Sequence, residues 1–244
     1  MGKLKYSIII PTLNEEKLLP SLLESLYDVK RMNHRSLEII VSDGGSCDCT
    51  LELAEKFSDK LLKHTNGNIR TISSGRARGA EESSGDILIF INADVRIDLG
   101  KLLQIVEEKF LPSNYAALTT KVKVFPEEEL SSDKYMATFL NGYFRFLNFL
   151  GMGMGRGECQ VIRKITYNKV GGYRKDLHAG EDFELFTRIR RQGKVLFIND
   201  FVVYESPRRY RKWGYFRIMR AWFLNSSASL FFKRSFSKSW ELIR

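Results

Sequence analysis

Polar residues that could bind a nucleotide, a sugar or a metal ion follow three short apolar segments near the start of the chain. These residues are Thr12 and Asn14 after 7–10, Asp43 after 37–42, and Asn92 and Asp94 after 87–91. A carboxylate at such a position could hold a divalent cation or a hydroxyl group. A structural role is an equal alternative for Asp94 alone, since it could cap a following helix. Turn formation explains the glycines after Asp43 but not the carboxylate itself.

Two further segments carry charged side chains in patterns that suit chemistry. Arg76 and Arg78 lie among small residues that lead into a helix ending at Gly85. Arginines at the start of a helix favour an anion, although the spacing is neither a P-loop nor GxGxxG. Glu181 and Asp182 begin a later helix, where the helix dipole alone would favour acidic residues. They are also candidates for acid–base chemistry.

The three apolar segments predict the scaffold that positions these residues. Each segment is too short for a core helix and has the composition of a strand buried on both faces of a parallel sheet. Helices are expected between them, over 16–27 with Asn14 as the cap, over 49–57, and after Arg76. Short strands are expected at 61–64 and 70–73. The alternation predicts an α/β fold with a mostly parallel sheet, which binds ligands at the carboxyl ends of its strands.

The second half of the chain continues the alternation less regularly. We expect a helix over 99–110, a strand over 116–125, an aromatic amphipathic helix over 133–150, a flexible loop over 151–157, and strands at 159–163, 194–198 and 201–204. The aromatic side chains of 133–150 are typical of a core or an interface. A homodimer face is therefore an alternative for that helix.

Positive charge is concentrated in the C-terminal part. Residues 1–150 contain 19 basic and 21 acidic residues, whereas residues 151–244 contain 20 basic and 8 acidic residues. This asymmetry indicates an anionic partner. Six basic residues lie within 208–220, and an aromatic, basic helix is expected over 215–232. Contact with a membrane surface through 206–232 and packing on its own domain are equally good interpretations; nucleic acid is not expected.

Cysteine content and hydropathy suggest a compartment. The three cysteines, Cys47, Cys49 and Cys159, have no framework spacing, which favours free thiols in a reducing environment over a disulfide or zinc site. No signal peptide or membrane-spanning segment is expected. We therefore expect a cytoplasmic protein, with the inner face of the cell membrane as a place of peripheral contact.

An ordered set of motifs resembles one known family. PTLNE, SDGGSCDCT, GRARGAEESSGD, INAD, and GGYR followed by AGEDFEL are together similar to a family 2 glycosyltransferase of the GT-A fold. The resemblance covers about residues 5–205. The later segment SPRRYRKWG is similar to a subgroup of small bacterial and archaeal members with undefined acceptors.

The resemblance implies a donor site for a nucleoside-diphosphate sugar. It implies that Pro11, Thr12 and Glu15 line the nucleoside site, that Asp43 hydrogen-bonds the base, and that Arg76 lies near the base or diphosphate. Asp94 would bind Mg²⁺ or Mn²⁺ as the second acid of an Asp-x-Asp triplet. Asn92 replaces the first acid, and this weakens the expected metal site. His178 is a weaker candidate for a further metal ligand.

The resemblance also implies the reaction and its base. Asp182 would take a proton from an acceptor hydroxyl, and Glu181 would orient the acceptor. The processive Gln-x-x-Arg-Trp signature is absent, so we expect inverting transfer of one sugar to an acceptor, with a polyprenyl phosphate or another lipid-linked molecule as a candidate. Two alternatives are a nucleotidyltransferase and a non-catalytic basic module that binds membranes or nucleic acid.

The expected organisation has two parts. Residues 1–205 would form the transferase domain, with a nucleotide-binding half over 1–110 and an acceptor half over 111–205. Residues 206–244 would form a basic amphipathic C-terminal segment that helps to complete the acceptor side.

Overall fold

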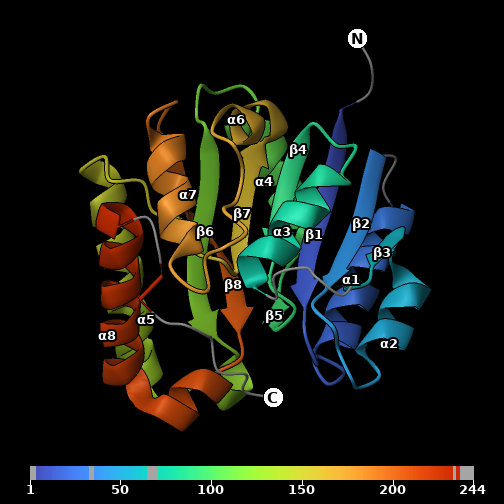
Figure 1. Ribbon diagram of the computed structural model, residues 1–244, viewed down its shortest axis with the longest axis horizontal. Helices are drawn as coiled ribbons and strands as arrows, with labels where there is room; N and C mark the ends of the chain where they lie inside the picture. Colours follow the sequence, from blue (N-terminus) through green and yellow to red (C-terminus); the bar gives the residue numbers. More distant parts are fainter. Residues whose placement is uncertain (1–3, 33–35, 65–70, 233–234, 237–244) are drawn as a thin grey trace.

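A single sheet forms the centre of the protein in this computed structural model, which describes residues 4–32, 36–64, 71–232 and 235–236 (Figure 1). Within these residues the sheet has eight strands in the order β3-β2-β1-β4-β7-β6-β8-β5. They are β1 (Lys5–Thr12), β2 (Ser36–Asp43), β3 (Lys60–Leu62), β4 (Ile87–Ile91), β5 (Val95–Arg96), β6 (Ala117–Val124), β7 (Cys159–Arg163) and β8 (Val195–Glu205).

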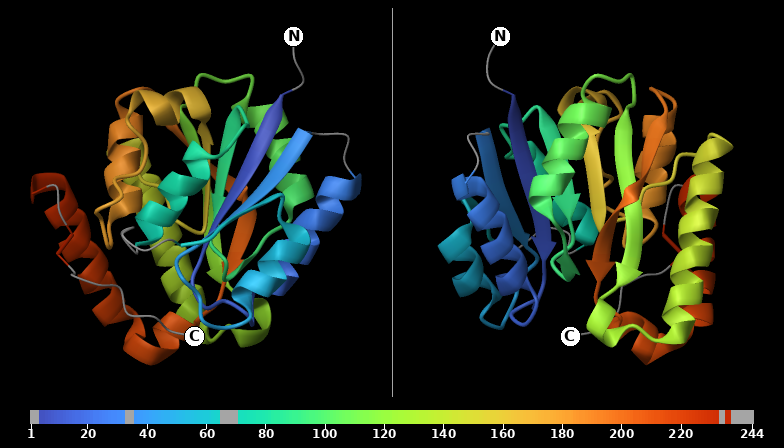
Figure 2. Two further views of the ribbon diagram at one scale, coloured as in Figure 1. Left: turned by 45° about the vertical axis from the view of Figure 1, so that its right-hand side comes forward. Right: turned by 180° about the vertical axis from the view of Figure 1, so that it is seen from behind.

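Helices cover both faces of this sheet. They are α1 (Leu19–Met32), α2 (Thr50–Phe57), α3 (Ile72–Glu81), α4 (Leu99–Ile105) with a π-helical continuation (Val106–Phe110), α5 (Ser131–Phe149), α6 (Lys164–Lys169), α7 (Glu181–Arg190) and α8 (Arg208–Phe232), with a short 3-10 turn at Pro126–Glu128. Helices α3, α6 and α7 lie on one face, and α1 and α4 lie on the other (Figures 1 and 2). The predicted α/β fold is confirmed.

Alternate residues of the central strands supply two separate cores. Ile8 and Ile10 pack with the leucines of α1 and α4, whereas Ile9 packs with Ala77 and Ala80 of α3 on the other face. All three isoleucines are fully buried. The central strands are therefore apolar on both sides, as the sequence predicted.

The parallel pairing brings the predicted polar residues to one end of the sheet, where the strands have their carboxyl ends. Strand β1 pairs in parallel with both β2 and β4, and Thr12 lies directly opposite Asp43. Asn92 follows the last residue of β4. Because these strands run in the same direction, their carboxyl ends and the loops that follow them share one end of the sheet.

Several local predictions were wrong. Helix α1 begins at Leu19, and Asn14 does not cap it: Asn14 has a φ of 53° and its side chain accepts a hydrogen bond from the Cys47 amide. Ile72 and Ser73 belong to α3 instead of a strand, because Thr71 caps that helix; residue 70 lies outside the described residues. The strands at 194–198 and 201–204 are one strand, β8. The 151–157 segment is not a loose loop, since residues 153–157 are buried.

Helices α5 and α8 both lie at the β6–β8 end of the sheet, and their N-terminal parts contact each other through Arg211 and Asp133 (Figure 1). Helix α8 begins at Arg208, earlier than expected, and bends at Gly214, whose φ is 71°. Residues 233–234 and 237–244 of the predicted C-terminal segment lie outside the described residues. Among the helices that are described, none is long and apolar enough to cross a membrane.

Candidate active site

A cavity of about 470 Å³ opens at the carboxyl ends of β1, β2 and β4. Most of the predicted site residues line it. These are Pro11, Thr12, Glu15, Arg76, Asn92, Asp94, His178, Glu181 and Asp182. Three arginines that the sequence did not assign to the site, Arg156, Arg208 and Arg209, line it as well. The fold thus gathers residues from both halves of the chain around one space.

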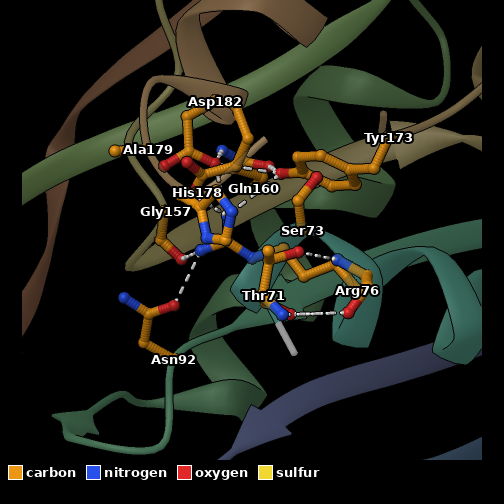
Figure 3. A network of polar contacts seen from close by, with 12 residues as sticks. Thr71, Ser73, Arg76, Asn92, Gly157, Gln160, Tyr173, His178, Ala179 and Asp182 are labelled. Atoms are coloured by element: carbon orange, nitrogen blue, oxygen red, sulfur yellow. Dashed lines mark hydrogen bonds and ion pairs between the residues drawn. The ribbon is translucent and has the colours of Figure 1, made fainter. Parts of the chain in front are cut away.

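The centre of the site is the guanidinium group of Arg76. Its Nη1 donates to Glu181 Oε1 at 2.9 Å and to Asp182 Oδ1 at 2.6 Å, and its Nη2 donates to Asn92 Oδ1 at 2.8 Å. Nη2 also reaches the carbonyl of Gly157 at 3.2 Å. Figure 3 shows this guanidinium between Asp182 on one side and Asn92 on the other. Arg76 therefore binds carboxylates, and its position in mid-helix differs from the expected helix start.

Local structure fixes the position of Arg76. The hydroxyl of Thr71 accepts from the Ser74 amide at 2.9 Å, which closes a capping box at the start of α3. Ser73 Oγ donates to the carbonyl of Arg174 at 2.6 Å and ties the helix to the loop before α7. Arg76 is only 1% exposed. Because both its helix and its guanidinium group are held in place, the Arg76 side chain is pre-organised for binding.

Asp182 is held by three neighbouring groups through one oxygen. Besides Arg76, Gln160 Nε2 donates to Oδ1 at 2.8 Å, and the hydroxyl of Tyr173 lies 3.0 Å from it. A side chain at Gly157 would place its Cβ 2.6 Å from the other oxygen, Oδ2, and 2.4 Å from Arg76 Nη2. The glycine therefore keeps space beside Oδ2, which the sequence did not reveal.

Burial changes the proton affinity of the two acids at the start of α7. Burial raises the pKa of Asp182 above its ordinary value, against the lowering effect of Arg76. Burial and the neighbouring charge of Asp182 raise the pKa of Glu181 to about 7. A carboxylate with a raised pKa is a better proton acceptor at neutral pH.

The loop after β2 is organised by Asp43. Its Oδ1 accepts from the amides of Gly45 at 2.7 Å and Ser46 at 2.9 Å, and Thr12 Oγ1 donates to Oδ2 at 3.3 Å. The Asp43 residue is fully buried. These bonds give the carboxylate a structural role in the loop beside the cavity; its predicted contact with a base stays a prediction.

Arg208, the first residue of α8, reaches the part of the cavity next to β1 and β4. It forms a two-point ion pair with Glu15, with distances of 3.0 and 2.7 Å, and its Nη2 lies 2.9 Å from Asp94 Oδ2. Its side chain is 19% exposed. Sequence analysis noted the basic segment but could not link Arg208 to residues so distant along the chain.

The residues implied for a divalent cation fit it only in part. Asp94 supplies a carboxylate at the cavity wall, but that carboxylate is paired with Arg208. Asn92 Oδ1 accepts a hydrogen bond from the Arg76 guanidinium, which occupies the oxygen that a metal ion would need. His178 lines the cavity, but no group of three acidic, histidine or cysteine residues suited to a metal occurs in the described part of the chain. Asp94 is thus the one ligand of the predicted set that fits.

A second buried ionic network borders the cavity and was not predicted. Arg156 contacts both oxygens of Glu158, at 3.2 and 3.1 Å, and Glu205 at 2.9 Å. Tyr210 donates to Glu205 Oε1 at 2.8 Å. Burial and the charge of Glu158 raise the pKa of Glu205 to about 8. The single arginine of the glycine-rich loop was the only sequence signal for this network.

The fold and the site together define a class of protein. The central sheet with its flanking helices is the GT-A fold of nucleotide-sugar transferases. The sequence model of glycosyl transferase family 2 matches residues 7–171. The chain therefore belongs to this family.

Curated relatives with similar sequences are named as glycosyltransferases. The chain is 30% identical over 212 residues to the 4,4'-diaponeurosporenoate glycosyltransferase of Staphylococcus haemolyticus, covering 78% of this chain and 56% of the relative. It is 30% identical over 207 residues to a dolichyl-phosphate beta-glucosyltransferase of Trichomonas vaginalis, covering 80% and 57%. The chain thus spans little more than half the length of either relative.

Solved structures of similar fold include two with bound donors. A mannosyltransferase from Pyrobaculum calidifontis in complex with GDP-Man and Mn²⁺ has a TM-score of 0.69 at 19% identity, over 96% of this chain and 65% of that one. The structure of residues 1–349 of TarS from S. aureus with UDP-GlcNAc has a TM-score of 0.62 at 18% identity, over 83% and 58%. At these identities the similarity concerns the fold.

Proposed function

We propose that this protein is an inverting glycosyltransferase that moves one sugar from a nucleoside-diphosphate sugar to a lipid-linked acceptor. The observation that carries the proposal is the placement of Asp182 in the same cavity as Thr12 and Asp94. The strand ends would bind the donor on one side, and α7 would present a base on the other. Family membership supports the transfer of a sugar.

The donor would bind where the first two loops meet. Pro11, Thr12 and Glu15 line the cavity there, and Gly44 allows close approach to the loop that Asp43 organises. Arg208 would add positive charge for a diphosphate. Similar folds that hold GDP-Man and UDP-GlcNAc support a nucleotide-sugar donor without naming its base or sugar.

A divalent cation belongs to the proposal in a limited form. Mg²⁺ or Mn²⁺, when bound, would stabilise the negative charge on the leaving diphosphate. Asp94 is the residue that would hold it, together with donor oxygens and water. Because Asp94 is paired with Arg208, the cation would bind only after that ion pair opens.

Asp182 would serve as the base for an acceptor hydroxyl. Its Oδ1 is held by Arg76, Gln160 and Tyr173, and Oδ2 lies beside Gly157, where space remains. Glu181 would orient the acceptor or share a proton with Asp182, since the two acids are adjacent and both have raised pKa values. An acceptor that is already a phosphate would need less help from this base.

The acceptor side of the cavity favours a molecule with an apolar part. Phe144 of α5, Met154 of the glycine-rich loop and Trp222 of α8 line it, beyond Asp182. Both curated relatives described above carry lipid acceptors in their names. A polyprenyl phosphate or another lipid with one reactive hydroxyl fits this combination. Two further expectations stay predictions: a homodimer face on the helix at 133–150, and a division of the transferase domain into halves at 1–110 and 111–205.

The proposal is tested first by donor binding. Thermal shifts are measured with UDP-, GDP-, dTDP- and CDP-sugars, each with Mn²⁺ and with EDTA. One nucleotide should stabilise the protein, and EDTA should remove the effect. No shift with any donor would contradict the proposal and favour the non-catalytic module.

The base is tested by Asp182→Asn. The variant should keep its donor-induced thermal shift but lose at least about a hundredfold in turnover on a hydroxyl acceptor, because the amide cannot take the proton. Turnover is followed as release of the nucleoside diphosphate. Unchanged turnover would place the base elsewhere or identify an anionic acceptor.

A further inference from the structure

Helix α5 carries a continuous row of exposed aromatic and apolar side chains. Its members recur every three or four residues and continue just past the helix: Tyr135, Phe139, Tyr143, Phe146, Phe149, Leu150 and Met152. Tyr135 is 78% exposed and Phe149 is 85% exposed. These seven are half of the fourteen exposed large apolar residues in the described part of the chain. So dense a row marks an interaction surface.

The orientation of this row is fixed by the opposite side of α5. Ala137, Leu140 and Leu147 are buried against the body of the protein. The side chain of Asn141 accepts from the Val122 amide at 3.0 Å and donates to its carbonyl at 2.8 Å, which binds the helix to β6. The aromatic row therefore points away from the protein on a firmly anchored helix.

The charges on α5 and α8 are almost all positive. Helix α5 contains one acidic residue, Asp133, which is fully buried, whereas Lys134 and Arg145 are exposed. The sequence of α8 contains no acidic residue at all. Exposed aromatic and basic residues alternate along it, with Phe216 at 82% and Phe223 at 69% exposure beside Arg217 and Arg220. The two helices offer apolar contact and attraction to anions together.

An internal ion pair joins the two helices. Arg211 of α8 contacts both oxygens of Asp133, at 2.9 and 2.5 Å, and the hydroxyl of Tyr215 donates to Asp133 at 2.6 Å. The negative charge of Asp133, which would repel an anionic surface, is thus balanced by Arg211 inside the protein. Both helices lie at one end of the sheet (Figures 1 and 2).

We propose that α5 and α8 together form a docking surface for a membrane that contains anionic lipids. The aromatic row would enter the interface between headgroups and acyl chains, and the basic residues would contact lipid phosphates. The sequence had indicated only 206–232 for such contact; α5 supplies the larger apolar share. Phe144 and Trp222 of these same helices line the cavity, so a docked protein would have its acceptor side next to the bilayer. This last point rests on the proposed function, whereas docking itself does not.

The test is sedimentation of the purified protein with vesicles of phosphatidylcholine alone or mixed with phosphatidylglycerol. The protein should bind the mixed vesicles at low salt and less well at high salt, because ionic attraction is screened. The double variant Phe139→Ser, Phe146→Ser should weaken binding at least about tenfold, since both rings lose their apolar environment. Arg217→Gln with Arg220→Gln should weaken it several-fold and reduce its salt dependence.

A control variant distinguishes binding through this surface from non-specific hydrophobic binding to vesicles. Ile165→Ser on α6 removes an equally exposed apolar side chain, 77% exposed, at a different place and should leave binding unchanged. Equal binding by the control and by the α5 variant would overturn the proposal. A failure to bind mixed vesicles would overturn it as well. If light scattering then detected a dimer that the α5 variant dissociates, the surface would be an interface between two copies of the protein. Donor-induced thermal shifts, measured on the same variants without lipid, report separately on the proposed function.

Discussion

At the scale of single residues, the contact between Arg208 and Asp94 has the most direct chemical consequence. A guanidinium occupies the carboxylate that the family resemblance assigns to a metal ion. The two cations would compete for Asp94, because like charges held close together repel each other. The cation affinity of the protein without donor should therefore be limited by Arg208.

Arg208→Gln should increase Mn²⁺ binding in the absence of donor by at least about threefold, since the competing charge is gone. Calorimetry or the electron paramagnetic resonance of free Mn²⁺ measures this directly. Arg217→Gln, which removes the same charge farther along α8, should leave the affinity unchanged. Identical Mn²⁺ affinities for the Arg208 variant and the wild type would show that Arg208 does not compete with the metal ion for Asp94.

Gly157 makes a second prediction at this scale. Gly157→Ala would force a methyl group to within 2.6 Å of Asp182 Oδ2 and 2.4 Å of Arg76 Nη2. We expect turnover to fall at least about a hundredfold and stability to fall by about 1 to 3 kcal/mol, because buried groups must move apart. Gly142→Ala on α5 is the control, since its Cβ meets nothing within 4 Å. An active Gly157→Ala enzyme would show that the spacing around Asp182 is not critical.

At the scale of elements, sequence patterns predicted what depends on neighbours along the chain. The strands at 87–91 and 159–163 were predicted with the boundaries they have; for 87–91 the reason is that a short, continuous apolar run has a local signature. The start of α3 was missed because its cap, Thr71, follows no apolar pattern. For 133–150, periodicity identified an amphipathic helix but could not tell which surroundings its aromatic face has.

The contacts that build the site could not be predicted in the same way. Arg76 meets Glu181 and Asp182 across more than a hundred residues, and Arg208 meets Glu15 across 193 residues. Such pairs depend on how the sheet is ordered, which no local pattern records. The family resemblance named most of the residues that line the cavity, including Arg76, but the contacts of Arg76 with the two acids and the presence of Arg208 became visible only in the folded chain.

At the scale of the whole molecule, buried acids should make stability depend on pH. The folded protein raises the pKa of Glu181 to about 7 and of Glu205 to about 8, whereas an unfolded chain has the ordinary value of 4.5. Between these values the unfolded chain has lost protons that the folded protein keeps. The free energy of unfolding should therefore fall as the pH rises from about 4.5 to about 8.

Glu205→Gln tests this prediction, because the amide resembles the neutral acid. The variant should be more stable than the wild type at pH 8, by about 1 to 3 kcal/mol, and should show a smaller change between pH 5 and pH 8. Urea unfolding at the two pH values measures both quantities. Glu55→Gln removes an exposed acid and serves as the control. Parallel pH profiles for Glu205→Gln and the wild type would refute this assignment.

The position of Arg76 also connects the end of β4 with the start of α7, because its guanidinium group contacts Asn92 as well as Glu181 and Asp182. Asn92, which follows β4, accepts a hydrogen bond from the Arg76 guanidinium but carries no charge. The full positive charge of Arg76 therefore acts on Glu181 and Asp182. Asn92→Asp would place a third acid beside Arg76, and its negative charge should raise the pKa values of Glu181 and Asp182. The pH profile of kcat/KM should therefore shift to higher pH. If Asp182 is the base, the pH range in which it accepts a proton would thus be set in part by Asn92, a residue at the end of β4.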